Sequence, residues 1–314
     1  MMSAASAPVL DAVPQPAAGA QGVVRTLTRI EVGRLLRQPV FIIAVLLFVL
    51  TAVMGSVNEY ANADYVITEG GGTESNLDWP VLPAFMLGLG GLIAMNRVTK
   101  GASRAGDVVL AAPASAFQRS LALCLACLVP AGIALLAGVF EFTRWMVDPP
   151  VQSMSWGEFT SGELAAIVLQ GVLAALGGPL LGVAVARWWR WPTAGAITAV
   201  GLILWSVLSG VVRDTSVWER LLHHTAPFTL VAYNTEGVSW TQGGNHYWRF
   251  AYLVGLCLLA AIAACAHGST GELRRTLVRA ALIVGGLTIL ALALTVLTGQ
   301  VGHYGPWDPR WTLS

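Results

Sequence analysis

The chain has 314 residues, of which 55% are hydrophobic and only 11% are charged, and its formal net charge at pH 7 is +1. Soluble globular domains carry about a quarter charged residues, so this composition excludes an ordinary soluble protein and indicates a membrane protein. The near-neutral charge balance gives no reason to expect a nucleic-acid partner.

The N-terminal part divides into a tail and a helix. Residues 1–21 are rich in Ala and Pro and hold no apolar run of signal-peptide length, which predicts a disordered cytoplasmic tail. Residues 22–38 predict an amphipathic interfacial helix in the inner headgroup layer, with a simple juxtamembrane anchor as the alternative. Its apolar residues are Val24, Leu27, Ile30, Leu35 and Leu36. Its charged residues include Arg29, Glu31, Arg34 and Arg37.

Residues 39–299 form the predicted transmembrane domain. Seven apolar segments in it are long enough, or nearly so, to cross ~30 Å of hydrocarbon as helices. They are 39–57, 80–96, 120–140, 164–186, 192–212, 250–266 and 280–298. We therefore expect an all-α fold, a polytopic membrane helix bundle of six to seven transmembrane helices with an amphipathic N-terminal interfacial helix.

Small and special residues inside the spans predict how the helices pack. Glycines in the second and fourth spans allow close helix approach, either within one chain or between two copies. These are Gly88, Gly91, Gly178 and Gly182. Pro130 and Pro179 lack a backbone donor, so each is expected to kink its helix or to need a neighbouring donor. The four cysteines fall in or at the edge of apolar spans, where we expect packing rather than disulfides.

Positive charge is sorted between the two sides of the bundle. If the spans alternate in direction, thirteen of the eighteen Lys and Arg residues share one side. They are Arg25, Arg29, Arg34, Arg37, Arg97, Lys100, Arg104, Arg119, Arg187, Arg190, Arg274, Arg275 and Arg279. Cytoplasmic loops collect Lys and Arg, so we expect the N-terminus inside and the C-terminal tail, 300–314, outside. The excess of Arg over Lys is typical of GC-rich bacterial genomes, so the expected location is a bacterial cell membrane.

The external segment 213–249 is rich in aromatic and aliphatic residues. Such content predicts re-entrant or interfacial helices at the outer leaflet. The segment also holds His223, His224 and His246. Adjacent histidines point to different faces of a helix, so we favour interfacial hydrogen bonding over a metal site and expect no metal centre in the chain.

The loop at 97–119 has the features of a docking element. Ser103 to Ala112 predict a short helix that ends at Pro113. Such a helix, held between two spans and parallel to the membrane, suits docking to a soluble partner better than chemistry on a small molecule.

The order of these motifs resembles the permease subunits of ABC-2 type transporters. The pre-span helix reads R-x-E-x-x-R-L-L-R-x-P from Arg29 to Pro39, and an acid, Asp107, stands six residues before the P-x-S of Pro113 and Ser115. Over roughly residues 25–212, the resemblance implies that the pre-span helix packs beside an ATPase and that 97–119 holds a cytoplasmic coupling helix. The residues it assigns to coupling and ATPase docking are Arg97, Lys100, Arg104, Asp107, Val108, Pro113, Ser115 and Arg119. The chain departs from the family at Arg104 and Ala105, where members have a Gly-Thr pair, and in its seventh span.

The sequence limits the chemistry that the chain can perform. It has no G-x-x-x-x-G-K-[ST] loop, so it does not cradle ATP phosphates by the usual arrangement. It has no G-x-S-x-G or H-E-x-x-H motif, so we expect no enzyme activity. No predicted span has a charged residue at its centre, which counts against proton-driven transport.

We therefore expect the permease subunit of an ABC exporter for a lipophilic or peptide-like substrate. The chain binds no cofactor in this hypothesis, because ATP and Mg belong to two copies of a cytoplasmic ABC ATPase subunit. A second copy of the chain or a related permease completes the transporter in the lipid bilayer. Two alternatives stay open: an outer-leaflet lipid-modifying enzyme that uses His223, His224 or His246, and a non-transporting membrane anchor or immunity protein. The sequence predicts no substrate-binding residues.

Overall fold

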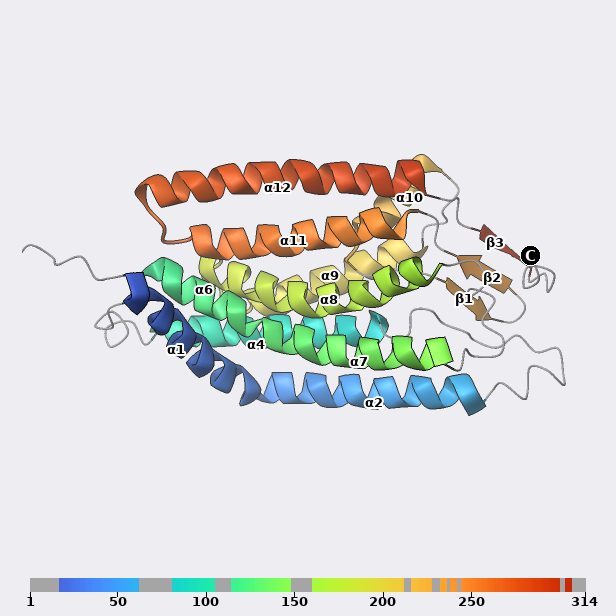
Figure 1. Ribbon diagram of the computed structural model, residues 1–314, viewed down its shortest axis with the longest axis horizontal. Helices are drawn as coiled ribbons and strands as arrows, with labels where there is room; N and C mark the ends of the chain where they lie inside the picture. Colours follow the sequence, from blue (N-terminus) through green and yellow to red (C-terminus); the bar gives the residue numbers. More distant parts are fainter. Residues whose placement is uncertain are drawn as a thin grey trace, which may run out of the picture.

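Long helices dominate the computed structural model, which describes residues 17–61, 81–104, 114–147, 160–211, 216–227, 232–235, 238–241, 244–299 and 303–306. The helices are α1 (Ala17–Leu36), α2 (Pro39–Ala61), α4 (Val81–Arg104), α6 (Ala116–Ala126), α7 (Leu128–Val147), α8 (Ser161–Trp188), α9 (Ala194–Val211), α10 (Val217–Thr225), α11 (His246–Ala266) and α12 (Gly271–Thr298). The strands are β1 (Ala232–Thr235), β2 (Val238–Thr241) and β3 (His303–Pro306). Figure 1 shows the long helices side by side along one axis, with α1 oblique to them at one end.

Several helices have the length and composition of membrane spans. Within the described residues, five helical segments are long and apolar enough to cross a membrane: α4, α6 with α7, α8, α11 and α12. α1 and α2 meet at a 70° bend and add a sixth candidate if they count as one span, and α9 is a shorter apolar helix. The structure thus has the five to six long apolar helices that a multi-pass membrane bundle requires, whereas seven crossings stay a prediction. The predicted span 280–298 lies within α12.

Several helix boundaries differ from the predicted spans, and two of the differences bear on the sites below. α4 continues to Arg104, so the first part of the predicted loop 97–119 belongs to a long helix. α11 begins at His246 rather than at 250, because the Asn245 side chain accepts hydrogen bonds from the backbone N–H groups of Tyr247 (3.1 Å) and Trp248 (3.3 Å) and caps the helix. This second difference moves Arg249 from a loop into a helix.

The prolines have different effects on the two helices that contain them. The predicted third span is divided between α6 and α7 at Cys127, three residues before Pro130. A proline at position 130 offers no N–H to the Ala126 carbonyl and its ring crowds that carbonyl, so the predicted disturbance is found there. α8, in contrast, runs through Pro179 without a break.

Outside the helices, the described chain holds a small antiparallel sheet. β2 lies between β1 and β3 and pairs with both, so that Val238 faces Thr235 on one side and Pro306 on the other. The sheet therefore joins the predicted external segment 213–249 to the C-terminal tail. In that segment the sequence indicated helices, whereas its described residues hold one short helix, α10, two strands and the first turn of α11. The all-α prediction holds for the bundle but not for this appendage.

Glycine contacts join α4 to α8 along a seam within one chain. The two helices run in the same direction and form the most extensive helix pair in the described structure. A Cβ atom added to Gly178 would collide with the backbone of Gly88, and one added to Gly182 would collide with the Leu92 carbonyl. Gly91 faces Pro179, with 2.6 Å between such an added Cβ and the ring Cγ. Of the two alternatives for these small residues, the structure selects the internal contact.

The cysteines pack as predicted. Cys124, Cys127, Cys257 and Cys265 are all free and buried. As small apolar side chains they pack within the bundle, and the thiols of Cys127 and Cys257 donate to the carbonyls of Leu123 and Leu173.

Candidate coupling surface at the basic end

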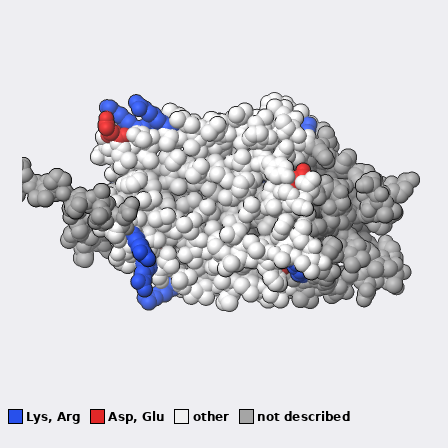
Figure 2. All heavy atoms as spheres, in the orientation of Figure 1, with Lys and Arg blue, Asp and Glu red and all other residues white. Residues whose placement is uncertain are grey.

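Basic side chains gather at one end of the bundle, which we call the basic end. The C-terminal ends of α4, α8 and α11 and the N-terminal ends of α6 and α12 lie there together with α1. All thirteen Lys and Arg residues that alternating spans would bring together belong to these helix ends or to the turns beside them. Figure 2 shows Lys and Arg atoms at this end, over α1 and the start of α12, and a broad uncharged band along the bundle. The predicted sorting of charge is therefore a property of the folded chain.

The helix α1 turns Glu31 and Leu35 toward the bundle. Leu35 is fully buried, and Glu31, one turn earlier, is only 8% exposed. Ile30 and Leu36 are each 48% exposed. A helix covers most of the predicted range 22–38 and begins at Ala17, inside the predicted tail. Its position in the inner headgroup layer stays a prediction, and the burial of Glu31 was not predicted.

Glu31 is balanced by two arginines. Its Oε1 accepts a hydrogen bond from Nη1 of Arg34 at 3.2 Å. Burial raises the pKa of Glu31, and the charges of Arg34 and Arg187 oppose that rise. The other arginines assigned to this helix, Arg29 and Arg37, are exposed. α1 therefore turns its acid inward and its free positive charge outward.

The end of α4 is tied to the helices beside it. Asn96 Nδ2 donates a hydrogen bond to the carbonyl of Gly182 on α8 at 3.3 Å. Lys100 Nζ donates to the carbonyl of Trp191, in the turn between α8 and α9. Arg97, between them, is exposed. Of the predicted docking residues on α4, Lys100 thus links helices, and Arg97 is available at the surface.

The centre of the predicted coupling helix is not described. Asp107, Val108 and Pro113 lie outside the described residues, and so does the side chain of Arg104. A coupling helix between Ser103 and Ala112 therefore stays a prediction. The structure does place its two attachment points, the end of α4 and the start of α6, at the basic end.

The start of α6 is fixed by a capping box. Ser115 Oγ accepts a hydrogen bond from the backbone N–H of Gln118 at 3.1 Å, and Gln118 Oε1 accepts one from the backbone N–H of Ser115 at 2.9 Å. Arg119 Nη2 donates to the Ala114 carbonyl at 2.9 Å. Ser115 and Arg119, which the resemblance assigns to docking, thus form hydrogen bonds that fix the N-terminus of α6. The Ser-x-x-Gln spacing was a signal for this cap that the sequence analysis missed.

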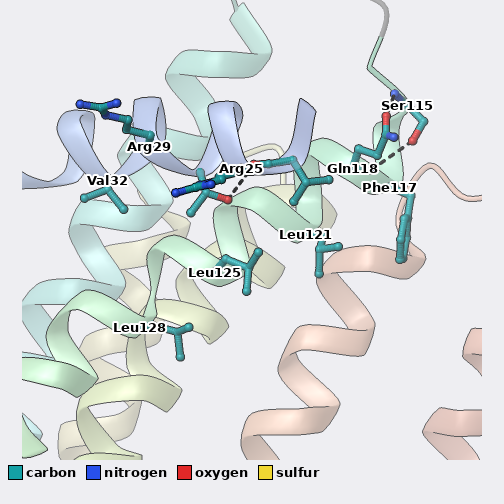
Figure 3. Close-up of a pocket in the computed structure, with 11 residues that line it drawn as sticks. Arg25, Arg29, Val32, Ser115, Phe117, Gln118, Leu121, Leu125 and Leu128 are labelled. Carbon is teal, nitrogen blue, oxygen red and sulfur yellow. Dashed lines mark hydrogen bonds between the residues drawn. The ribbon is translucent and has the colours of Figure 1, made fainter. Parts of the chain in front are cut away.

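An open groove of about 1030 Å³ lies between α1 and the segment formed by α6 and the start of α7. Arg25 and Arg29 of α1 line it, and we call them the cationic rim. The opposite side carries an apolar wall, formed by Phe117, Leu121, Leu125 and Leu128. Figure 3 shows these side chains along the two elements, with Arg25 between the α1 and α6 ribbons. The groove combines positive charge and apolar surface in one place.

A buried polar cluster at the opposite end holds α10 against the bundle. Arg249 is 2% exposed, and its Nε donates to Oε1 of Gln170 on α8 at 3.1 Å. Its Nη1 donates to the His224 carbonyl at 3.2 Å, and its Nη2 donates to the Ala226 carbonyl at 3.1 Å. One guanidinium therefore joins three elements and satisfies carbonyls at the end of α10. The sequence analysis missed this cluster because it began the span after Arg249.

The histidines near this cluster are buried, and two of them have hydrogen-bond partners. Nδ1 of His223 lies 2.8 Å from the Ser209 carbonyl on α9, and Nδ1 of His224 lies 3.1 Å from Nη1 of Arg249. His223, His224 and His246 are all buried. Hydrogen bonding, which the sequence analysis favoured for His223 and His224, is what the structure shows. Within the described residues, no group of three His, Cys, Asp or Glu side chains is placed to hold a metal ion.

No protein-family model, curated protein or solved structure matches this chain.

Proposed function

We propose that the chain is the membrane-spanning permease subunit of an ABC exporter. Two copies of a separate cytoplasmic ATPase subunit, which bind ATP and Mg, dock on the basic end. A second copy of the chain or a related permease completes the transporter in a bacterial cell membrane. The observation that carries the proposal is the collection of thirteen basic residues at the end that also holds α1 and both attachments of the 105–113 segment. By the positive-inside rule this end faces the cytoplasm, and α10 and the sheet face outside.

The contacts of α4 support a role in transmitting motion. Coupling requires a stiff element that leads from the ATPase into the bundle. α4 is continuous to Arg104, and the glycine contacts with α8 make the two helices move as one body. The hydrogen bond from Asn96 to Gly182 adds to the α4–α8 contact, and the hydrogen bond from Lys100 to Trp191 ties the α8–α9 turn to α4. A push on residues 105–115 would therefore tilt α4 and α8 together.

The distribution of charge supports an external source of energy. In the described spans, charged side chains lie toward the helix ends, as with Glu141 and Arg144, which pair at 2.7 Å near the end of α7. Ion-coupled transporters retain ionisable groups near the bilayer centre because those groups carry the coupling ion. ATP hydrolysis by a partner fits this chain better, and an apolar path suits a lipophilic or peptide-like substrate.

The enzyme alternative has weaker support. Its candidate groups His223, His224 and His246 are 0%, 1% and 4% exposed, so a lipid headgroup does not reach them in this conformation. A non-transporting anchor differs from a permease subunit in one measurable way, because an anchor does not stimulate ATP hydrolysis by a partner ATPase.

The test is co-reconstitution in liposomes with a P-loop ATPase encoded next to this chain. We expect Arg104→Ala with Asp107→Ala to lower stimulated ATP hydrolysis and export by at least about ten-fold, the scale of a typical coupling energy. The matched control is Glu272→Ala with Arg274→Ala, which removes one acid and one base from the start of α12 and should leave both activities. Survival of stimulated hydrolysis and export after the first double change would refute the docking assignment.

A further inference from the structure

We propose that the groove between α1 and the α6–α7 segment binds one anionic phospholipid from the leaflet at the basic end. The lipid phosphate lies on the cationic rim, and one acyl chain lies along the apolar wall. The proposal needs a bilayer around the bundle but no ATPase, so it can fail or succeed separately from the proposed function.

The cationic rim places two arginines beside the groove. Arg25 and Arg29 stand one helical turn apart on one face of α1, and both are exposed. The ion pair that the structure describes on this helix joins Glu31 to Arg34, and burial of Glu31 keeps that carboxylate away from the rim. A guanidinium group presents paired N–H donors that match phosphate oxygens, so two of them form a strong anion site.

The apolar wall has the length of one leaflet. Phe117, Leu121, Leu125 and Leu128 recur every three or four residues and so share one face. From Phe117 to Leu128 the helix rises about 16 Å, close to half of the roughly 30 Å hydrocarbon core. Leu125 is 37% exposed and Leu128 is 54% exposed, so the lower wall is open at the side. An acyl chain can enter there from the surrounding bilayer.

The arrangement of rim and wall favours a lipid over a soluble protein. The 70° bend between α1 and α2 turns α1 across the helix ends, where headgroups lie if the bundle spans a bilayer. The wall then continues from α6 into α7, to a depth that a water-soluble ATPase does not reach. A molecule with an anionic head and a long apolar tail satisfies both parts. The cytoplasmic leaflet, which the positive-inside rule assigns to this end, is rich in anionic lipid.

The experiment is native mass spectrometry of the whole chain in mild detergent, titrated with dioleoylphosphatidylglycerol or with dioleoylphosphatidylcholine. We expect one tight site that prefers the anionic lipid. Arg25→Gln with Arg29→Gln should weaken that site by about 10- to 30-fold, as two lost basic contacts imply. Arg25→Lys with Arg29→Lys keeps the positive charge but removes the paired donors, so it should weaken the site less than the Gln double change does. Leu121→Trp, which fills the groove, should weaken the binding of both lipids.

Matched controls separate this site from general attraction to a basic surface. Arg274→Gln with Arg275→Gln removes the same charge from the same end, on α12, and should change binding less than about two-fold, as expected for exposed charges outside a site. Leu282→Trp places the same bulk on the exposed face of α12 and should have no effect. Circular dichroism and gel filtration verify that each variant is folded.

Four results would overturn the proposal. The first is equal binding of the two lipids by the unchanged protein. The second is an equal loss in the two arginine double variants. The third is displacement of the lipid by inorganic phosphate at concentrations comparable to the lipid, which would make the wall irrelevant. If the unchanged protein shows no tight lipid site and the rim variants lose ATPase binding instead, the groove belongs to the protein partner.

Discussion

The α4–α8 seam and the α1–α6 groove are both contacts between two helices, yet one is closed and the other is open. In the seam, glycines remove the side chains that would hold the helices apart, and the two backbones touch. In the groove, arginines and leucines keep α1 away from the start of α7 and leave about 1030 Å³ between them. The molecule therefore has a tightly packed centre and an open margin at the basic end. We expect substitutions to affect folding at the first and binding at the second.

The largest effect is expected at the seam. Gly178→Leu forces a side chain against the backbone of Gly88, where nothing can move aside cheaply, and should cost at least about 3 kcal/mol of folding free energy. Gly286→Leu makes the same chemical change on α12, where an added Cβ meets no atom within 4 Å. Thermal unfolding in detergent, followed by circular dichroism, measures both. Equal stability of the two variants would show that the seam is not tight.

The next largest effect is expected at Arg249, at the end of the bundle opposite the basic end. Arg249→Met keeps most of the side-chain volume but removes the donors to Gln170, His224 and Ala226. Because two buried carbonyls lose a charged donor, we expect a loss of about 3 kcal/mol and early exchange of backbone amides in α10. Arg274→Met, on the exposed start of α12, is the control. Hydrogen exchange that is unchanged in 217–225 would contradict the role given to Arg249.

A smaller effect is expected at the entrance of α6. Ser115→Ala removes the capping box and should cost about 1 kcal/mol, seen as faster hydrogen exchange near 116–119. Ser115→Asp keeps a capping acceptor and should restore protection. In the co-reconstituted transporter this pair also separates two roles. If Ser115→Asp is stable but uncoupled, Ser115 contacts the ATPase directly; if it is stable and coupled, its role is the cap.

The smallest effect concerns Glu31. Since burial raises its pKa, the folded state binds a proton more readily than the unfolded chain. Wild-type stability should therefore rise as pH falls from neutral through that raised pKa, and level off below the ordinary glutamate pKa. Glu31→Gln lacks this dependence and should be more stable than wild type near pH 7, by less than about 1 kcal/mol, with a difference that shrinks on acidification. If the difference in stability between wild type and Glu31→Gln is the same near pH 7 and at acidic pH, the effect of burial on Glu31 is refuted.

The position of the long helices followed from the sequence because apolar length is a local property. The extent to which each helix is buried inside the molecule did not follow from the sequence. α4 and α12 both pass as membrane spans, yet 72% of the α4 span and only 22% of the α12 span is buried inside the molecule. Burial of a membrane helix depends on its neighbours, and an apolar residue has the same letter whether it faces lipid or protein. The glycines of α4 and α8 were the one sequence signal for the central pair.

Polar residues account for most of the misses at the candidate sites. Glu31 and Arg249 are buried, although charged residues are usually exposed. Hydrogen bonds to specific partners offset the cost of burying each charge. The sheet joins residues near 235 to residues near 305, a pairing between distant segments that a local reading does not reveal. The groove forms because α1 lies beside α6, and the predicted topology did not include this contact.

The account depends most on the basic end facing the cytoplasm. The direct measurement is labelling of single introduced cysteines with a membrane-impermeant maleimide, against a low background because the four native cysteines are buried. Gly101→Cys and Arg275→Cys report on the basic end, and Ser161→Cys, at the exposed start of α8, reports on the other. In intact spheroplasts we predict labelling of the Ser161→Cys variant alone, with the other two reacting only after lysis. Labelling of the Gly101→Cys or Arg275→Cys variant in intact spheroplasts would contradict the orientation and the docking of an ATPase there.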